Sequence, residues 1–228
     1  MSDLFLLTVI KKAKLFLRTY KFISSLVNKS IVSLLDEKLK DINTILDVGC
    51  GQCSPLRQLT NKPIYKVGVD IYEPYIEKSK LLYIHDYHVL GDARNLPFKT
   101  KSFECTMAIE VIEHLTKFEG LKMIKEMERI AKKRVILTTP NGLLLVKPGP
   151  EDNPEERHIS GWTAKGLRKL GFKVYGINGW KVLRGERAAL KFRPRWLFTK
   201  LSVMTNPLAY HYPSIAFQLF CFKDIEDH

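Results

Sequence analysis

Residues 45–55 read ILDVGCGQCSP: an apolar run ends in an aspartate, and two glycines and two cysteines follow. A short apolar, β-branched run that stops at glycine is typical of a buried strand entering a tight turn. The stretch SPLRQLT comes next and has helical character, so the turn joins a strand to a helix. Three interpretations are open at this point: a nucleotide-binding turn, a CxxC pair for redox chemistry or metal binding, and a plain connecting loop.

The rest of the chain alternates strands and helices around this turn. Besides the strand at 44–48, β-rich apolar runs predict strands at 65–71, 87–93, 102–110, 134–140, 173–177 and 215–223. Helical spacing predicts helices at 54–60, 74–83, 117–132 and 164–172. Such alternation produces right-handed βαβ units and a mostly parallel sheet with helices on both faces. The glycine turn then lies at the carboxyl end of the first strand, the edge where open α/β sheets bind ligands.

The chain has 228 residues, enough for one α/β domain, and it is strongly basic. Its 37 Lys and Arg against 24 Asp and Glu leave a formal net charge of +13. That charge favours an anionic partner such as nucleic acid, anionic lipid or a phosphorylated substrate, although solubility alone would also explain it. The four cysteines do not resemble a secreted disulfide framework, and the N-terminus lacks the basic region of a signal peptide. We therefore expect a cytoplasmic protein.

Three segments stand outside the regular alternation. Residues 1–43 predict one or two basic amphipathic helices, which either pack on the domain or make peripheral contact with a membrane surface. Residues 44–228 form the main domain. Within it, residues 141–161 and 178–213 show no regular pattern and are predicted to be lid or substrate segments. The second of these carries seven Lys or Arg and one acid.

Acidic residues lie at the carboxyl ends of three of the predicted strands, and they argue against a dinucleotide site. Such a site needs a third glycine that is missing here, and Asp47 would repel a pyrophosphate. A carboxylate at this position instead suits a ligand with positive charge. Asp70 at the end of the second strand can accept hydrogen bonds from both hydroxyls of a ribose, and Asp92 after the third can accept from an exocyclic amine. A cationic ligand with a ribose and an adenine amino group describes S-adenosylmethionine.

The motifs resemble, in order and spacing, those of class I S-adenosylmethionine-dependent methyltransferases. They are ILDVGCGQCSP, VGVDIYEP, GDARNLPF, FECTMAIEVIEHL and VILTTPNG, and the resemblance covers residues 44–177. Within the family the chain is most similar to the type 11 group, which includes quinone, glycan and small-molecule methyltransferases. The resemblance implies a Rossmann-like, doubly wound, seven-stranded sheet, mostly parallel with an antiparallel last strand, and an N-terminal helical extension. The family's usual third glycine is Cys53 in this chain.

The resemblance also implies which residues bind the cofactor S-adenosylmethionine. These are Asp47, Gly49, Cys50, Gly51, Asp70, Ile71, Asp92, Ala93 and Glu110. The glycines would let the backbone approach the methionine part of the cofactor, and Asp47 would hold its amino group. Asp70 would accept from the ribose hydroxyls, Asp92 would meet the adenine edge, and Glu110 would lie near the methyl group. Ile71 would lie against the adenine, and Ala93 would meet its edge beside Asp92.

Methyl transfer from a sulfonium asks little catalysis of the protein beyond holding the reactants in line. A general base is needed only when the acceptor arrives protonated, as a hydroxyl does. His114 in EVIEHL and His158 in ERHISGWT are the candidates for that base, with packing or capping roles as the alternative. No second cysteine pair or histidine cluster accompanies Cys50 and Cys53, so we predict no metal site.

The acceptor is predicted only as a class. The NPPY-type sequence typical of amide or adenine-amine methylation does not follow the fourth strand, where AIEVIEH stands. We expect a small-molecule, lipid-linked or glycan-type acceptor with a hydroxyl, and the basic charge suits an anionic one. RNA methylation through residues 178–213 is the main alternative. Two others come from different classes: a non-catalytic protein that keeps the cofactor fold, and a nicotinamide-dependent oxidoreductase, which Asp47 and the missing glycine disfavour.

Overall fold

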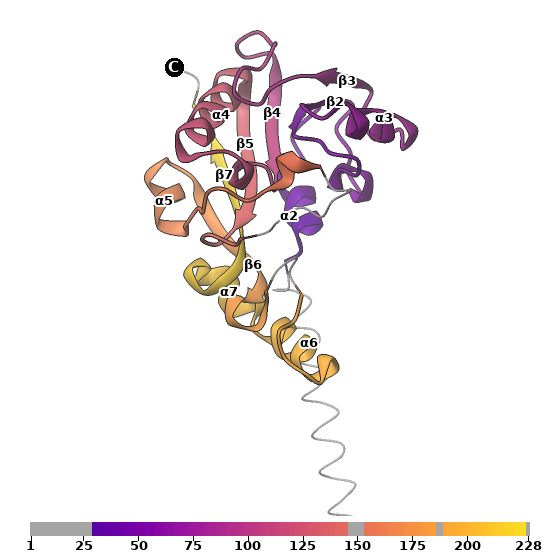
Figure 1. Ribbon diagram of the computed structural model, residues 1–228. Coiled ribbons are helices and arrows are strands. Elements are labelled where there is room, and N and C mark those ends of the chain that lie inside the picture. The colour runs from indigo at the N-terminus through magenta and orange to yellow at the C-terminus, as the bar shows by residue number, and fades with distance from the viewer. Residues whose placement is uncertain (1–28, 146–152, 186–188, 227–228) are drawn as a thin grey trace, which may run out of the picture.

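A seven-stranded mixed sheet forms the centre of the protein (Figure 1). The computed structural model describes residues 29–145, 153–185 and 189–226. The strands are β1 (Thr44–Val48), β2 (Tyr65–Asp70), β3 (Tyr87–Leu90), β4 (Phe103–Ile109), β5 (Ala131–Pro140), β6 (Lys173–Trp180) and β7 (Ala216–Asp224). Their order is β3-β2-β1-β4-β5-β7-β6, and β7 runs antiparallel to both of its neighbours. The predicted Rossmann-like sheet with an antiparallel last strand is confirmed.

The parallel strands end at one level, which brings the ends of distant segments together. Val48 of β1 is paired with Val69 of β2 and with Ala108 of β4. The chain passes from β1 to β2 and β3 on one side and later returns to β4 on the other. The edge beyond β1 is therefore a topological switch point, where open α/β sheets leave a crevice for ligands.

Helices cover both faces of the sheet (Figure 1). They are α2 (Ile31–Lys38), α3 (Glu73–Leu81), α4 (Lys117–Ile130), α5 (Ala164–Lys169) and α7 (Asn206–His211), whereas α6 (Arg195–Met204) lies beyond the end of β6. Successive strand residues point to opposite faces, so each face has its own core. Leu46 and Val48 face a core that includes residues of α4 and α5, whereas Ile45 faces a core that includes α2 and the partly buried Tyr210 of α7.

The helix α2 packs into the domain. Its Leu34 and Leu35 are fully buried, and the Ser30 side chain caps the helix by accepting from the Ser33 N–H at 3.1 Å. Residues 1–28, which carry most of the predicted basic amphipathic segment and the predicted membrane contact, lie outside the described residues. The division of the chain into an N-terminal segment, residues 1–43, and a main domain, residues 44–228, stays a prediction. Among the described helices, none combines the length and the apolarity needed to cross a bilayer.

The region 178–213 was predicted to be irregular, and the structure corrects this. Its described part holds the end of β6, the helices α6 and α7, and two 3₁₀ turns, η4 (Lys181–Leu183) and the start of η6 (Pro213–Ile215). Pro207 lies in the first turn of α7, where the missing N–H of proline costs nothing. The helices α6 and α7 were missed because they have only ten and six residues, and each begins beside a proline, Pro194 or Pro207, that interrupts a regular pattern. Conversely, the predicted helix at 54–60 is a single 3₁₀ turn, η1 (Pro55–Gln58).

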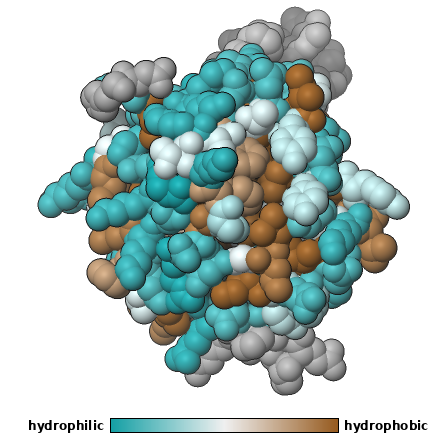
Figure 2. All heavy atoms as spheres, turned by 90° about the horizontal axis from the view of Figure 1, so that it is seen from above, coloured by the Kyte–Doolittle hydropathy of each residue, from teal (hydrophilic) through white to brown (hydrophobic). Residues whose placement is uncertain are grey.

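The surface mixes polar and apolar character. Figure 2 shows one end of the molecule, where hydrophilic side chains predominate and hydrophobic ones form patches between them. Exposed hydrophobic side chains are frequent around the end of α3 and β3, where Tyr83 is 90% exposed and Tyr87 61%. They are frequent again on α6 and α7.

Candidate active site

A cleft of about 520 Å³ opens at the carboxyl ends of β1, β2 and β4. Its volume lies in the range of small-molecule binding sites. All nine residues predicted to bind the cofactor line this cleft, and so does His114, whereas His158 does not. Lining residues that sequence reasoning missed include Tyr75, Arg94, Glu119, Asn153, Glu155, Glu156 and Ile159.

Two glycines with left-handed backbone shape the turn after β1. The φ angle is +67° at Gly49 and +56° at Gly51, a region that other residues rarely adopt. The N–H groups of Gly49 and Cys50 both donate to the carbonyl of Val69, at 2.7 and 3.0 Å, and hold the turn against β2. A Cβ atom built on Gly51 would meet no atom within 4 Å. The turn therefore presents bare backbone to open space in the cleft.

Asp70 is held in place by the same turn. Its Oδ2 accepts from the Gly51 N–H at 2.8 Å, and its Oδ1 accepts from the Tyr72 N–H at 2.9 Å. The residue is 8% exposed, and burial raises its pKa. Each carboxylate oxygen keeps a second lone pair, so this fixed group can still accept from two hydroxyls. Ile71 beside it is 49% exposed and offers an apolar surface.

Asp47 is buried and hydrogen-bonded to a histidine that the sequence analysis did not identify. Its Oδ2 lies 2.9 Å from Nε2 of His85, and both side chains are almost fully buried. On the other side of the ring, Nδ1 of His85 lies 3.4 Å from Oγ of Ser79. His85 lies outside the sequence motifs quoted above, so only the fold reveals that it pairs with Asp47. The histidine fixes the orientation of the Asp47 carboxylate at the cleft.

Asp92 is bound by a guanidinium. Arg94 donates from Nε to both carboxylate oxygens at 2.9 Å and from Nη2 to Oδ2 at 2.7 Å. These hydrogen bonds lower the pKa of Asp92. Arg94 also pairs with Glu119 of α4, so the part of the wall formed by Asp92 and Ala93 is tied to that helix. A ligand amine at Asp92 has to share the carboxylate with Arg94.

Glu110 follows β4 with a φ of +57°, a conformation that a non-glycine residue keeps only where its surroundings hold it. Its Oε1 accepts from the Thr138 hydroxyl at 2.9 Å and from the Gln218 amide at 2.7 Å. Burial raises the pKa of Glu110. Gln218 in turn accepts from the Asn178 side chain in β6. A chain of hydrogen bonds thus links the cleft to the region that carries α6 and α7.

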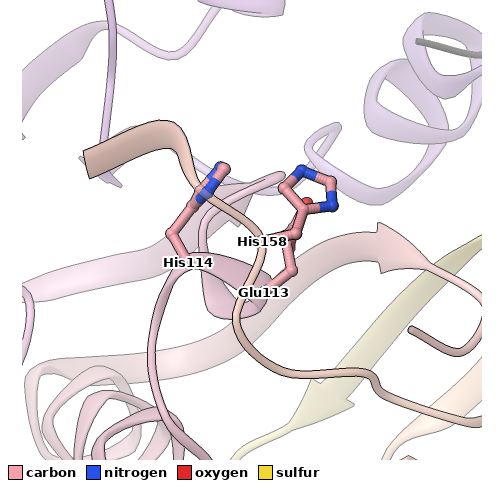
Figure 3. Close-up of side chains that lie close together, drawn as sticks. All are labelled: Glu113, His114 and His158. Atoms are coloured by element: carbon pink, nitrogen blue, oxygen red, sulfur yellow. The ribbon is translucent and has the colours of Figure 1, made fainter. Parts of the chain in front are cut away.

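Three ionisable side chains, those of Glu113, His114 and His158, lie close together (Figure 3). Glu110 is a neighbour of Glu113. Glu113 and His114 come from the 3₁₀ turn η2 (Ile112–His114), and His158 comes from the segment after η3 (Pro154–Glu156). The two imidazole rings are 4.9 Å apart between centroids. Burial lowers the pKa of both histidines. Burial and the charge of Glu110 raise the pKa of Glu113 well above its ordinary value.

Residues 153–159 border the cleft and are tied to both of its sides. The Tyr75 hydroxyl on α3 donates to Oε1 of Glu156 at 2.5 Å, and both residues line the cleft. The N–H groups of Ile159 and Ser160 donate to the carbonyl of Glu113, at 2.9 and 3.1 Å. This segment belongs to the region 141–161, whose role as a lid stays a prediction.

The cleft is acidic although the protein is basic. Among the described residues that line it, Arg94 is the one Lys or Arg, against seven acidic side chains: Asp47, Asp70, Asp92, Glu110, Glu119, Glu155 and Glu156. A cleft lined by one sign of charge concentrates ligands of the opposite sign. S-adenosylmethionine carries a sulfonium and an ammonium, so the charge, the bare glycine turn and the fixed Asp70 carboxylate all fit this cofactor.

Cys50 and Cys53 do not form a pair. Both are free thiols, and Cys50 is buried while Cys53 is exposed. Burial and the nearby carboxylate of Asp47 raise the pKa of the Cys50 thiol, which is the opposite of what an activated thiol needs. This arrangement argues against the CxxC interpretation of the turn.

Comparisons with known proteins agree with the fit to the cofactor. Residues 46–139 match the family model of the methyltransferase domain. The chain is 30% identical over 111 residues to probable tRNA methyltransferase 9B of Homo sapiens, covering 48% of this chain and 22% of that protein. It is 29% identical over 135 residues to a sterol 24-C-methyltransferase of Aspergillus fumigatus, covering 53% and 33%. The chain thus spans a third or less of the length of these two relatives.

A solved structure agrees with the fold. The S-adenosylmethionine-dependent methyltransferase from Archaeoglobus fulgidus superposes with a TM-score of 0.52 at 16% identity, covering 90% of this chain and 99% of that one. Together, the family match, the strand order and the cleft between β1, β2 and β4 lead to one assignment. Residues 46–139 match a methyltransferase domain, and the chain has the fold and the cleft of a class I S-adenosylmethionine-dependent methyltransferase.

Proposed function

We propose that the domain methylates a hydroxyl of a small amphiphilic or lipid-linked acceptor at a membrane surface. When bound, S-adenosylmethionine supplies an electrophilic methyl group. The chain's own residues then have to hold the cofactor, align the acceptor and keep water out. The glycine turn, Asp70 and Ile71 hold the nucleoside and methionine parts, and residues 153–159 cover them.

The observation that carries the acceptor class is the exposed surface of α6 and α7. Residues 191–213 contain four Lys or Arg and no acid. Within them Trp196 is 63% exposed, and Met204 and Leu208 are each 53% exposed. Nζ of Lys200 lies 5.3 Å from the centroid of the Trp196 ring. A helix with exposed apolar side chains among cationic ones suits the interface of an anionic bilayer.

This surface lies at the same edge of the sheet as the cleft. Pro140 at the end of β5 and Ile177 in β6 are both paired with Gln218 of β7, so β5 and β6 run in the same direction. The end of β6, and with it α6, therefore lies at the edge where the parallel strands end (Figure 1). An acceptor anchored in a bilayer would approach the cleft from this side.

Sedimentation with lipid vesicles tests the surface. We expect the full chain to bind phosphatidylcholine vesicles that contain phosphatidylserine, and the Trp196→Glu/Met204→Glu variant to bind them less. Phe118→Glu is the matched control, because Phe118 on α4 is 68% exposed and also meets a lysine. Equal binding by the α6 variant and the wild type would refute a membrane role for this surface.

RNA methylation is the second candidate, because the relatives include probable tRNA methyltransferase 9B and the α6–α7 surface is basic. Transfer of the labelled methyl group from tritiated S-adenosylmethionine into a total lipid extract or into total RNA distinguishes the lipid-linked acceptor from the RNA acceptor. Label in the organic phase supports the proposal, whereas label in RNA, lost steeply with added salt, replaces it. Cofactor binding without label in any fraction would favour a non-catalytic protein. Asp70→Ala is the control for cofactor-dependent label.

A further inference from the structure

The cluster of Glu113, His114 and His158 contains buried polar atoms that lack a partner. Both carboxylate oxygens of Glu113 are buried and make no hydrogen bond of good geometry within the described residues, although Glu110 and the Thr139 hydroxyl, itself buried and unpaired, lie close to them. The Nδ1 atoms of His114 and His158 are likewise buried and unpaired. Burying unpaired polar atoms is costly, and a group of them at one point indicates a ligand that completes their coordination.

We propose that Glu113, His114 and His158 bind a divalent transition-metal cation beside the cofactor cleft. One ligand atom from each side chain lies within 4.8 Å of the others. A metal ion at about 2.1 Å from each ligand holds neighbouring ligands about 3–3.4 Å apart, so side-chain rotations have to bring the three ligand atoms closer by up to about 1–2 Å to close the site. A carboxylate with two imidazoles suits Mn²⁺, Fe²⁺, Co²⁺ or Zn²⁺.

Charge supports the site independently of the distances. Glu113 lies beside Glu110, and in the described chain no Lys or Arg pairs with either carboxylate. Two neighbouring buried carboxylates need a proton or a cation to compensate their charge.

The backbone fixes the two halves of the site to each other. The N–H groups of Ile159 and Ser160 donate to the carbonyl of Glu113, and Nε1 of Trp162 donates to the carbonyl of Ile112 at 3.2 Å. His158 is thereby held against η2, although it is far away along the chain (Figure 3). Sequence spacing did not indicate the site, because its third member comes from a separate segment.

The position gives the cation a role that rests on the proposed function. His114 and Glu110 line the cleft, so a cation at this site is within reach of the acceptor. A cation held by Glu113, His114 and His158 would bind the acceptor oxygen and lower the pKa of its hydroxyl, whose proton would pass to solvent. The oxygen forms its bond to the methyl carbon as the methyl–sulfur bond breaks, and the electron pair stays on sulfur. The two histidines predicted as bases are then ligands.

Titration of the metal-free full chain with Mn²⁺, followed by electron paramagnetic resonance, tests the site. We expect one Mn²⁺ per chain, and binding at least about tenfold weaker in Glu113→Gln and in His158→Ala. His211→Ala is the matched control, because His211 is an exposed histidine on α7 away from the cluster. No saturable binding by the wild type, or unchanged binding in Glu113→Gln, would overturn the inference.

Thermal melting distinguishes a side chain that binds the metal from one that only supports the fold. Mn²⁺ should raise the Tm of the wild type and of His211→Ala but not that of Glu113→Gln, because a ligand stabilises only the state that binds it. If Glu113→Gln does not fold, His158→Ala provides the same comparison. Calorimetry with S-adenosylmethionine on the metal-free protein distinguishes the two proposals. Cofactor binding without Mn²⁺ binding defeats the metal site alone, and loss of both defeats the methyltransferase function as well.

Discussion

Replacing Asp70 with alanine should weaken S-adenosylmethionine binding while the protein stays folded. The carboxylate is held by the N–H groups of Gly51 and Tyr72, and its free lone pairs face the cleft. A hydrogen bond to a charged group is worth about 1.5–3 kcal/mol, which corresponds to a dissociation constant about 10- to 150-fold higher. Isothermal titration calorimetry measures the change directly.

The same substitution removes the acceptor of two backbone N–H groups, so its effect on the fold has to be measured separately. We expect a loss of about 1–3 kcal/mol in the free energy of unfolding, read from urea denaturation. Asp86→Ala is the control, because Asp86 accepts from the N–H and Nζ of Lys66, at 2.7 and 2.8 Å, and does not line the cleft. It should lose stability and keep cofactor binding. If Asp70→Ala binds the cofactor as tightly as the wild type, the carboxylate does not contact the ribose.

Three further predictions test the turn, a helix start and the thiols. Gly49→Ala should weaken cofactor binding and cost at least about 1 kcal/mol of stability, because φ is +67° and the new Cβ would lie 2.5 Å from Cγ2 of Val111. Gly51→Ala, with open space around it, should cost less stability, and an equal loss in urea denaturation would contradict the geometry. Thr116→Ala should lower the free energy of unfolding by about 0.5–2 kcal/mol, because it removes the capping box of α4; an unchanged urea midpoint would count against this. Iodoacetamide at pH 8 should label Cys53 in the folded protein and the three buried cysteines only after unfolding, as mass spectrometry would show, since burial raises the pKa of their thiols.

The central parallel strands were predictable because a strand that is buried on both faces is apolar along most of its length. The run 102–110 predicted the fourth strand, and β4 spans Phe103–Ile109. α6 was not predictable by the same reasoning, because it has only ten residues and begins after Pro194, in a segment that Pro207 interrupts again. Its exposed apolar side chains, among them Trp196 and Met204, do not distinguish so short a helix from a loop.

Part of the site follows from topology and part does not. Asp70 and Glu110 could be placed together because the ends of parallel strands meet at one edge. The pairing of Asp47 with His85 could not, since it joins a strand end to a residue before β3 that belongs to no motif. The same holds for the hydrogen bond from Tyr75 to Glu156, which depends on how residues 153–159 cross the cleft.

The distribution of charge limits the acceptor more than the net charge does. A polyanion drawn to the basic α6–α7 surface would meet seven acidic side chains on entering the cleft. Its phosphates would have to stay outside, where salt screens their attraction over about 8–10 Å. A neutral hydroxyl at the end of an apolar anchor meets no such repulsion. The salt dependence of turnover separates the acceptors when the lipid-linked acceptor is presented in phosphatidylcholine vesicles without anionic lipid, because the α6–α7 surface then has no charged bilayer to bind. Added salt should leave transfer to that neutral hydroxyl almost unchanged, whereas transfer to RNA should fall with its affinity.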